Sequence, residues 1–136
     1  MIIYRTGKDI ELSAMIDVYE ASTLGARRPV GDRGRMASML SNANIVVTAW
    51  DEDLLVGISR ALSDFSFVTY LSDLAVRASH QRSGIGKELI RWTQQASGPD
   101  AKLILLAAPA AAEYYAHIGF QHQPRAWMLD ARQSLR

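Results

Sequence analysis

A strand, a loop with two glycines and an amphipathic helix follow one another in the middle of this chain. The run from Phe65 to Val76 is rich in β-branched and aromatic residues, which favours a strand. The run Ala101 to Ala107 is almost continuously apolar and predicts a strand covered on both faces. Between them, apolar residues recur at i, i+4, i+7 and i+11, the spacing of one helix face: Ile85, Leu89, Trp92 and Ala96. A strand, a helix and a strand in this order imply a right-handed parallel crossover in the middle of a sheet.

Strands and helices alternate along the rest of the chain as well, which predicts one α/β (α+β) domain over residues 1–136. Asp51-Glu52-Asp53 is a polar turn and predicts a hairpin between the strands that flank it. Thr6, with Asp9 three residues later, is typical of a helix N-cap, and Pro109 suits the first position of the last helix. The expected strands are 2–5, 44–50, 54–62, 65–76 and 101–107, with one or two short ones at Phe120 and 127–129. The expected helices are 6–21, a short one carrying Met36, Met39 and Leu40, then 84–96 and 109–119.

The composition argues against several classes of function. Fifteen basic and fourteen acidic residues give a net charge of +1, whereas a surface built to bind nucleic acid needs a basic excess. Because there is no cysteine, disulfides, thiolate metal sites and a cysteine nucleophile are excluded. No charged leader precedes an apolar stretch, and no apolar run approaches the roughly 20 residues of a membrane helix. We therefore expect a cytoplasmic protein without nucleic-acid or membrane partners.

The loop before the central helix has the features of an anion site. A helix N-terminus presents unpaired N–H groups and a partial positive charge, and Gly84 and Gly86 let the backbone approach a phosphate closely. A Walker A loop does not fit, because Gln81 stands where its first Gly belongs and Glu88 where Ser or Thr follows the Lys. A dinucleotide fingerprint fits poorly too, because Leu89 stands at its third glycine or alanine. A tight strand-to-helix turn without a ligand remains the alternative.

Two motifs connect this loop to a known family. Gln81-x-x-Gly84-x-Gly86, preceded by Leu74-Ala75-Val76, resembles the coenzyme A signature of the GCN5-related N-acetyltransferase (GNAT) superfamily. The run Tyr114 to Phe120 resembles the family's last helix, in which a Tyr precedes a Gly-Phe pair by four residues. The resemblance covers essentially the whole chain. It implies the GNAT fold, a mixed and mostly antiparallel sheet of about six or seven strands, splayed between a parallel central pair and flanked by about four helices.

The resemblance also implies where acetyl-coenzyme A binds as co-substrate. In the family, the main chain of the strand before the loop pairs with the pantetheine arm, and backbone amides of the loop hold the pyrophosphate. The Arg82 side chain either adds a charge there or is a solvated loop residue. The expected coenzyme-binding residues are Leu74, Ala75, Val76, Gln81, Arg82, Ser83, Gly84, Ile85, Gly86 and Lys87.

Tyr115 matches the catalytic general acid of the family. Attack of an amine on the thioester expels a thiolate, which a phenol beside the sulfur can protonate. Tyr114 is the rival by sequence but lies on a neighbouring helix face, and both tyrosines could instead be half-buried packing residues. Many relatives also carry an Asn near the start of this helix that contacts the coenzyme. Residues 106–110 hold no polar side chain, so we expect that contact to be absent.

The general base is less evident. A protonated amine must lose a proton before it attacks. Strict alternation along the strand 65–76 places Tyr70, Ser72, Leu74 and Val76 on one face and Leu71, Asp73 and Ala75 on the other. The positions equivalent to family bases fall on Tyr70 and Ser72, which we expect to line the acceptor site while ordered water removes the proton. Asp73 is expected to anchor a neighbouring loop or helix by hydrogen bonds.

The predicted function is an acetyl-CoA-dependent N-acetyltransferase that acts on a primary amine of a small molecule or a protein by direct attack on the thioester. Two alternatives stay open: an acetyl-CoA-binding sensor or interaction module with weak turnover, and acetylation of charged tRNA, against which the near-neutral charge counts. A homodimer is compatible with the resemblance, because many relatives pair.

Two groups of residues fall outside these motifs. The three histidines, His80, His117 and His122, lack the spacing of metal ligands, so no metal is expected. Arginines gather before the second helix and either attract an acidic acceptor or form a solvated basic loop: Arg27, Arg28, Arg33 and Arg35.

Overall fold

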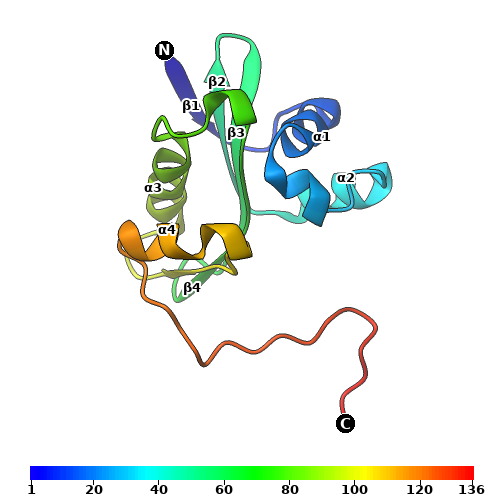
Figure 1. Ribbon diagram of the computed structural model, residues 1–136, viewed down its shortest axis with the longest axis vertical. Coiled ribbons are helices and arrows are strands. Elements are labelled where there is room, and N and C mark those ends of the chain that lie inside the picture. Colours follow the sequence, from blue (N-terminus) through cyan, green and yellow to red (C-terminus); the bar gives the residue numbers. More distant parts are fainter. The chain divides into compact units, whose positions relative to one another are not determined.

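The computed structural model describes residues 1–136. The chain forms two compact units, Met1–Leu106 and Ala107–Arg136, which we describe separately. The first unit is a five-stranded sheet with helices on its faces (Figure 1). Its strands are β1 (Ile2–Thr6), β2 (Ile45–Asp51), β3 (Leu54–Ser63), β4 (Val68–Val76) and β5 (Lys102–Ile104). Its helices are α1 (Leu12–Glu20), α2 (Arg33–Asn42) and α3 (Ile85–Ser97), with 3-10 turns η1 (Thr23–Arg27) and η2 (Ala78–His80).

The strands lie in the sheet in the order of the sequence, β1-β2-β3-β4-β5. The first four are antiparallel neighbours, and β5 is parallel to β4 after the α3 crossover. The mixed α/β fold and the parallel pair are therefore as expected, but the pair lies at one edge of the sheet and not in its middle. The sheet also has fewer strands than the expected six or seven, because no residue after Ile104 belongs to a strand.

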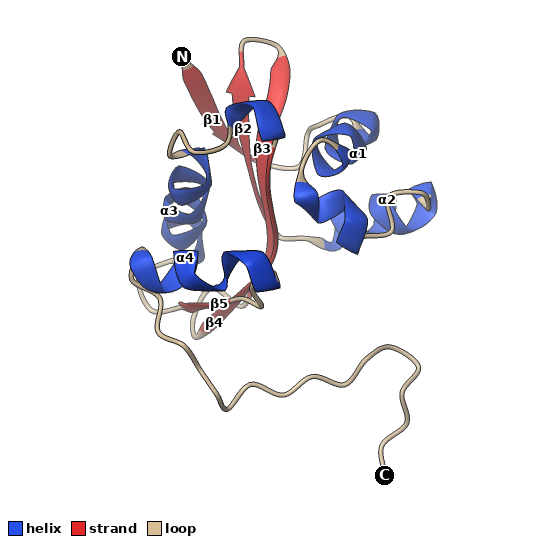
Figure 2. Ribbon diagram, in the orientation of Figure 1, coloured by secondary structure: helices blue, strands red, loops and turns tan.

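Different helices cover the two faces of the sheet (Figure 2). On one face α3 packs against β2, β3 and β4. Ile85 and Leu89 of the expected helix stripe are buried there, but Trp92 and Ala96 are only half-buried, and Thr93 and Ser97 complete the buried side instead. On the other face α1 packs against β3 and β4, and α2 lies beside α1. The core on this second face includes Met15, Val18, Tyr19, Met36 and Leu40. None of the helices is both long and apolar enough to cross a membrane.

A bulge in β4 interrupts the strict alternation of its side chains. Asp73 pairs with Arg60 of β3 and Leu71 pairs with Ala61, so Ser72 is an extra residue without a partner in the ladder. The faces therefore exchange at this point. The side chain of Thr69 reaches α3, whereas that of Asp73, also at an odd position, reaches α1. The bulge therefore interrupts the strict alternation that was expected to place Leu71 on the same face as Asp73 and Ala75.

Thr6 belongs to β1 and not to a helix start. It pairs with β2, and Gly7 after it still donates its N–H to the Val46 carbonyl at 2.9 Å. Because the ladder with β2 keeps this segment extended, the first helix begins only at Leu12, with Glu11 as its N-cap. The pairing of β1 overrides the local capping pattern of Thr6.

The second unit contains the last helix. Pro109 begins a 3-10 turn, η3 (Pro109–Ala111), which leads into α4 (Ala112–His117), so the expected start at Pro109 is confirmed. The segment after Phe120 forms neither helix nor strand, and Trp127 is 95% exposed. A strand needs neighbouring backbone groups to satisfy its own. No strand pairs with residues 127–129, so the strand expected there is absent.

Candidate functional site

The loop between β4 and α3 ends at a helix start with unpaired donors. Gly84 is the N-cap of α3 with φ of +85°, and no side chain caps the helix there. The N–H groups of the first turn therefore lack partners within the helix, and the helix dipole adds a partial positive charge. A Cβ at Gly84 would meet no atom within 4 Å. Of the residues expected to cradle a phosphate, 81–84 lie in this loop and 85–87 in the first helical turn.

Side chains within the loop hold its shape. The Gln81 amide donates from Nε2 to the Val76 carbonyl at 2.9 Å, and Ser83 Oγ donates to the His80 carbonyl at 2.6 Å. His80 Nε2 lies 2.8 Å from Asp51 Oδ2, which ties the loop to the β2–β3 hairpin. The loop is thus braced by its own side chains. The Gln81 N–H donates to the Ala78 carbonyl at 3.5 Å, while the backbone amides of residues 82–87 stay available. No group of three or more His, Cys, Asp or Glu side chains comes together as a metal site.

Two cationic residues of the expected coenzyme site, Arg82 and Lys87, have exposed side chains. Arg82 adopts a left-handed φ of +63°, which is uncommon for a residue other than glycine. The chain therefore turns sharply just before Gly84, and Arg82 is part of that turn as well as a source of charge.

β4 loses its parallel neighbour partway along its length. The ladder with β5 ends at the pair Tyr70 and Ile104, whereas β4 continues to Val76. Leu74, Ala75 and Val76 therefore lie on a stretch that pairs with β3 on one side and with no strand on the other. We call this stretch of β4, residues 71–76, the free edge. Such an edge offers backbone N–H and C=O groups to an extended ligand. Side chains already occupy two of its carbonyls, Arg28 that of Ser72 and Gln81 that of Val76.

Tyr70 and Ser72, expected to line the acceptor site, have different surroundings. Tyr70 is 37% exposed. Ser72 is half-buried at the bulge, where its Oγ accepts a hydrogen bond from Arg60 Nη2 at 2.9 Å and its carbonyl accepts one from Arg28 Nη2 at 2.8 Å. The Ser72 hydroxyl is therefore held inside a network, while Tyr70 remains accessible.

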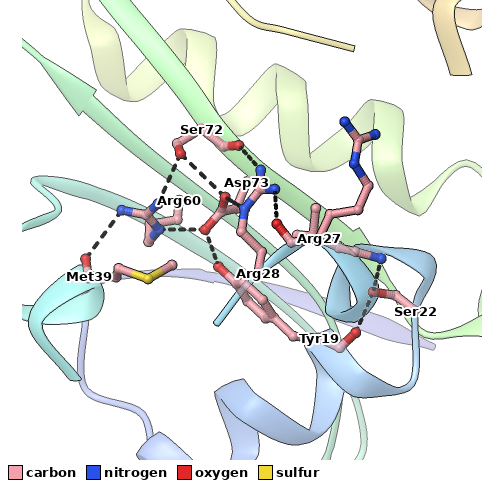
Figure 3. Close-up of polar contacts among 9 residues, drawn as sticks. Tyr19, Ser22, Arg27, Arg28, Met39, Arg60, Ser72 and Asp73 are labelled. Carbon is pink, nitrogen blue, oxygen red and sulfur yellow. Dashed lines mark hydrogen bonds and ion pairs between the residues drawn. The ribbon is translucent and has the colours of Figure 1, made fainter. Parts of the chain in front are cut away.

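Asp73 is the centre of a buried ionic cluster that joins several elements (Figure 3). Its carboxylate accepts hydrogen bonds from Tyr19 Oη of α1, from Arg28 Nε after η1 and from Arg60 Nε of β3, each at 2.6 Å. Arg60 also donates from Nη1 to the Met39 carbonyl of α2 at 3.4 Å. The expectation that Asp73 anchors a neighbouring loop or helix is confirmed, and it anchors both. We call Tyr19, Arg28, Arg60, Ser72 and Asp73 the Asp73 cluster.

The protonation states within the cluster follow from its contacts. Burial raises the pKa of Asp73, but the hydrogen bond and charge of Arg60, with the bonds from Tyr19 and Arg28, hold the pKa below its usual 3.8. Burial also raises the pKa of Tyr19, and the Asp73 charge raises it further. At neutral pH the cluster therefore holds one carboxylate, one neutral phenol and two guanidinium groups. With its oxygens already bonded, Asp73 is poorly placed to act as a base.

Tyr115 lies on α4 in the second unit and packs edge-on against two aromatic rings. Its ring centroid is 5.4 Å from that of Tyr114 and 5.5 Å from that of Phe120. Burial raises the pKa of Tyr115, and Tyr114 adds to the rise. The phenol therefore keeps its proton at neutral pH, as a general acid must. Tyr114 is the more exposed of the two, at 40%.

Sequence reasoning missed the partners of Asp73. A carboxylate on a buried strand needs cationic or hydroxyl partners, so the need for them was visible in Asp73 itself. Arg60, Arg28 and Tyr19 are 13, 45 and 54 positions away along the chain. No local spacing marks residues so distant, and only the bulge turns Asp73 toward them.

Comparison with known proteins gives one family. Residues 42–122 match the family model described as acetyltransferase (GNAT) domain. Among curated proteins, the histone acetyltransferase TAP1 of Glycine max is 28% identical over 144 residues, which cover 90% of this chain and 57% of that protein. The chain spans about half the length of the curated relatives it matches, between 53% and 57%.

Solved structures share the fold at low sequence identity. An aminoglycoside acetyltransferase from an uncultured soil metagenomic sample, solved in complex with sisomicin, has a TM-score of 0.72 at 22% identity, over 96% of this chain and 97% of that one. Aminoglycoside N-acetyltransferase AAC(6')-Iy, solved in complex with CoA, has a TM-score of 0.71 at 15% identity, over 97% and 95%. At these identities the likeness concerns the fold alone.

Proposed function

The chain belongs to the GNAT acetyltransferase family, and on that premise we propose that it transfers the acetyl group of acetyl-coenzyme A to a primary amine of a small molecule or a protein. The observation that carries the proposal is that the free edge of β4 leads directly to the uncapped start of α3. An extended pantetheine arm needs backbone partners along a strand, and a pyrophosphate needs N–H donors at a helix start. This part of the chain offers both in succession.

The residues present fit the coenzyme. The main chain of Leu74, Ala75 and Val76 would pair with the pantetheine arm, and amides from Gln81 to Lys87 would hold the pyrophosphate. When bound, acetyl-coenzyme A supplies an activated thioester. The CoA complex of AAC(6')-Iy supports this assignment, while the sisomicin complex and the name of TAP1 support small-molecule and protein amines as acceptors.

The proton of the acceptor amine would leave through ordered water. Tyr70 of β4 is exposed, but phenols are poor bases at neutral pH. Ser72 and Asp73 are engaged within the Asp73 cluster. No side chain of β4 is thus free to take the proton. On the leaving-group side, Tyr115 Oη would donate its proton to the sulfur as the thiolate departs.

The first test places a charge in the proposed cradle. Gly84→Asp should abolish acetyl-CoA binding in calorimetry, because a carboxylate at the helix start repels the pyrophosphate. Gly84→Asn adds a side chain of the same shape without charge and should bind far better than Gly84→Asp. Gly84→Ala adds only a Cβ at the same φ of +85°, so it controls for backbone strain. Acetyl-CoA affinity that is equal in all three variants and the wild type would refute the cradle.

The second test concerns the acid. Tyr115→Phe removes the only proton that this side chain can donate. It should lower kcat by about 10²-fold or more, the usual scale of general acid catalysis, and change acetyl-CoA affinity little. Thiol release measured over an amine panel gives kcat. An unchanged kcat would remove Tyr115 from the mechanism.

A coenzyme-binding module with weak turnover is the second candidate, and the absence of a free base on β4 favours it. Tight acetyl-CoA binding without thiol release on any amine, including polyamines and peptides, would select this function over the first.

A further inference from the structure

The Asp73 cluster carries more positive than negative charge. Arg28 and Arg60 both bind one carboxylate, each through Nε at 2.6 Å, and the third partner, Tyr19, is a neutral phenol. Asp73 is the only carboxylate that pairs with Arg28 and Arg60, so no second acid compensates from within the cluster. The cluster therefore keeps a net charge of about +1 at neutral pH. A buried positive charge of this kind attracts an anion wherever it reaches the surface.

The excess charge reaches the surface through Arg28. Its side chain is 25% exposed, against 9% for Arg60. Three of its N–H groups are in use: Nε on Asp73, Nη1 on the Arg27 carbonyl and Nη2 on the Ser72 carbonyl. A guanidinium has five N–H donors, so two remain for a ligand, and the contacts already made hold the group rigidly in place.

Arg27, next to Arg28 in the sequence, is a second cation. The Arg27 side chain is exposed and carries no dashed contact in the close-up, where it extends away from the carboxylate (Figure 3). Arg27 contributes only its backbone carbonyl to the network. The pair thus combines a fixed guanidinium with a free one, an arrangement suited to a carboxylate that arrives from solvent.

The position of Arg28 relates this charge to the free edge of β4. The Ser72 carbonyl that Arg28 binds belongs to the bulge, two residues beyond Tyr70, where the β4–β5 ladder ends. Arg28 therefore lies beside the start of the edge along which we place the coenzyme arm. An acceptor that approaches this part of β4 meets a positive charge.

We propose that the acceptor is an amine that also carries a carboxylate, and that Arg28, assisted by Arg27, binds that carboxylate. The inference rests on the proposed acetyltransferase function and deepens it, since it names the chemical class of the acceptor. Arg28 orients the acceptor, and Asp73 is a positioning residue that fixes the guanidinium.

The wild-type protein provides the first test, which is independent of any folding defect. Acetyl transfer is measured for 4-aminobutyrate and 6-aminohexanoate and for the corresponding carboxamides, in which the amine is nearly unchanged and the negative charge is gone. The carboxylates should have a kcat/KM at least about tenfold higher, because hydrogen bonds between a guanidinium and a carboxylate are stronger than those to a neutral amide. Equal values, or a preference for the amides, would overturn the proposal.

Variants assign the preference to its residues. Arg28→Gln and Arg27→Gln should each lower the carboxylate-to-carboxamide ratio of kcat/KM, and Arg28→Gln should bring it close to one. A purely structural role would lower activity on both acceptors and leave the ratio as it is. Arg35→Gln removes an exposed arginine of α2 and should keep the wild-type ratio. A ratio that survives Arg28→Gln would refute the role of Arg28.

A binding measurement separates this inference from the function on which it rests. If no amine is acetylated, calorimetry compares 4-aminobutyrate with its carboxamide on the wild type and on Arg28→Gln. Tighter binding of the carboxylate that is lost in Arg28→Gln would support the anion site while the transferase proposal fails. Equal binding of the two compounds would refute the anion site as well.

Discussion

The two faces of the sheet are joined to their helices by different chemistry. On the α3 face the buried polar contacts are between hydroxyls, Ser59 with Thr93 at 2.6 Å and Thr69 with Ser97 at 2.8 Å. On the α1 face they converge on the carboxylate of Asp73 and include two guanidinium groups. A neutral hydrogen bond contributes about 1 kcal/mol net, whereas removing one partner of a buried ion pair costs about 3–5 kcal/mol.

The difference follows from what each face must hold. α3 is one continuous helix of 13 residues, and two short hydroxyl side chains one turn apart are enough to fix it on the sheet. The α1 face is assembled from α1, the η1 loop and α2, and the Asp73 cluster contacts each of them. Arg28 reaches Asp73 from the end of η1, and Arg60, opposite Asp73 on β3, connects it to the Met39 carbonyl of α2. The face covered by several elements therefore depends on charged contacts, and the face covered by one helix does not.

The largest effect should come from neutralising the centre of the charged face. Asp73→Asn leaves the buried guanidinium of Arg60 and the partly exposed one of Arg28 without their counter-ion, so we expect a loss of about 3–5 kcal/mol in the free energy of unfolding by urea. Asp17 of α1 forms an ion pair with Arg77 at the same 2.6 Å, but its side chain is 62% exposed. Asp17→Asn should therefore lower the free energy of unfolding by no more than about 1 kcal/mol. Similar losses in both variants would mean that burial does not distinguish the two pairs.

On the neutral face, the steric fit of α3 should give the next largest effect. A Cβ at Gly57 of β3 would lie 3.0 Å from Leu89 Cδ1 and 3.2 Å from Ile85 Cγ2. Gly57→Val should therefore lower the free energy of unfolding by up to about 3 kcal/mol through overpacking. Gly34 of α2 is exposed, with no atom closer than 3.6 Å to an added Cβ. Gly34→Val should change stability by less than about 0.5 kcal/mol.

A smaller effect is expected from the hydroxyl contacts. Thr93 Oγ1 donates to the Leu89 carbonyl at 2.8 Å, so Ser59 Oγ must be the donor in their shared bond. Thr93→Val leaves the buried Ser59 hydroxyl without an acceptor and should lower the free energy of unfolding by about 1–2 kcal/mol. Adding Ser59→Ala removes the unpaired donor. The double variant should therefore lose less free energy of unfolding than the two single variants lose together. Strict additivity in this cycle would show that the two hydroxyls do not interact.

The smallest effect should appear on acidification. The folded pKa of Asp73 lies below 3.8, so its contribution to stability is present above that pH and is lost as the pH falls through the folded value. Asp73→Asn should therefore lose less stability between pH 5 and acid than the wild type, while Thr93→Val should parallel the wild type. Backbone N–H groups of Phe67, Val68 and Ser66 also lower the pKa of Asp64, to about 2, and this contribution is the same in all three proteins. Parallel curves for Asp73→Asn and the wild type would contradict the assignment.

Sequence reasoning was more accurate on the neutral face than on the charged one. The spacing of Ile85 and Leu89 predicted the helix and the first half of its buried side, because local periodicity determines which face of a helix is apolar. The second half is formed by the polar Thr93 and Ser97, which such a pattern does not mark. The bulge at Ser72 could not be predicted, since an extra residue in a strand leaves no mark in a two-residue pattern. The partners of Asp73 were equally hidden, because they come from three separate elements. The coenzyme loop was predicted from a motif and stays a prediction, while the start of α3 at Gly84 was correctly placed.

The free edge of β4 has a further consequence for the behaviour of the protein in solution. Unpaired backbone groups along a strand accept any extended chain, including the edge of a second molecule, and are a common starting point for aggregation. A ligand that pairs with residues 71–76 would occupy the groups that a neighbouring chain needs. Protein purified without its ligand should therefore lose solubility on concentration sooner than protein kept saturated with it.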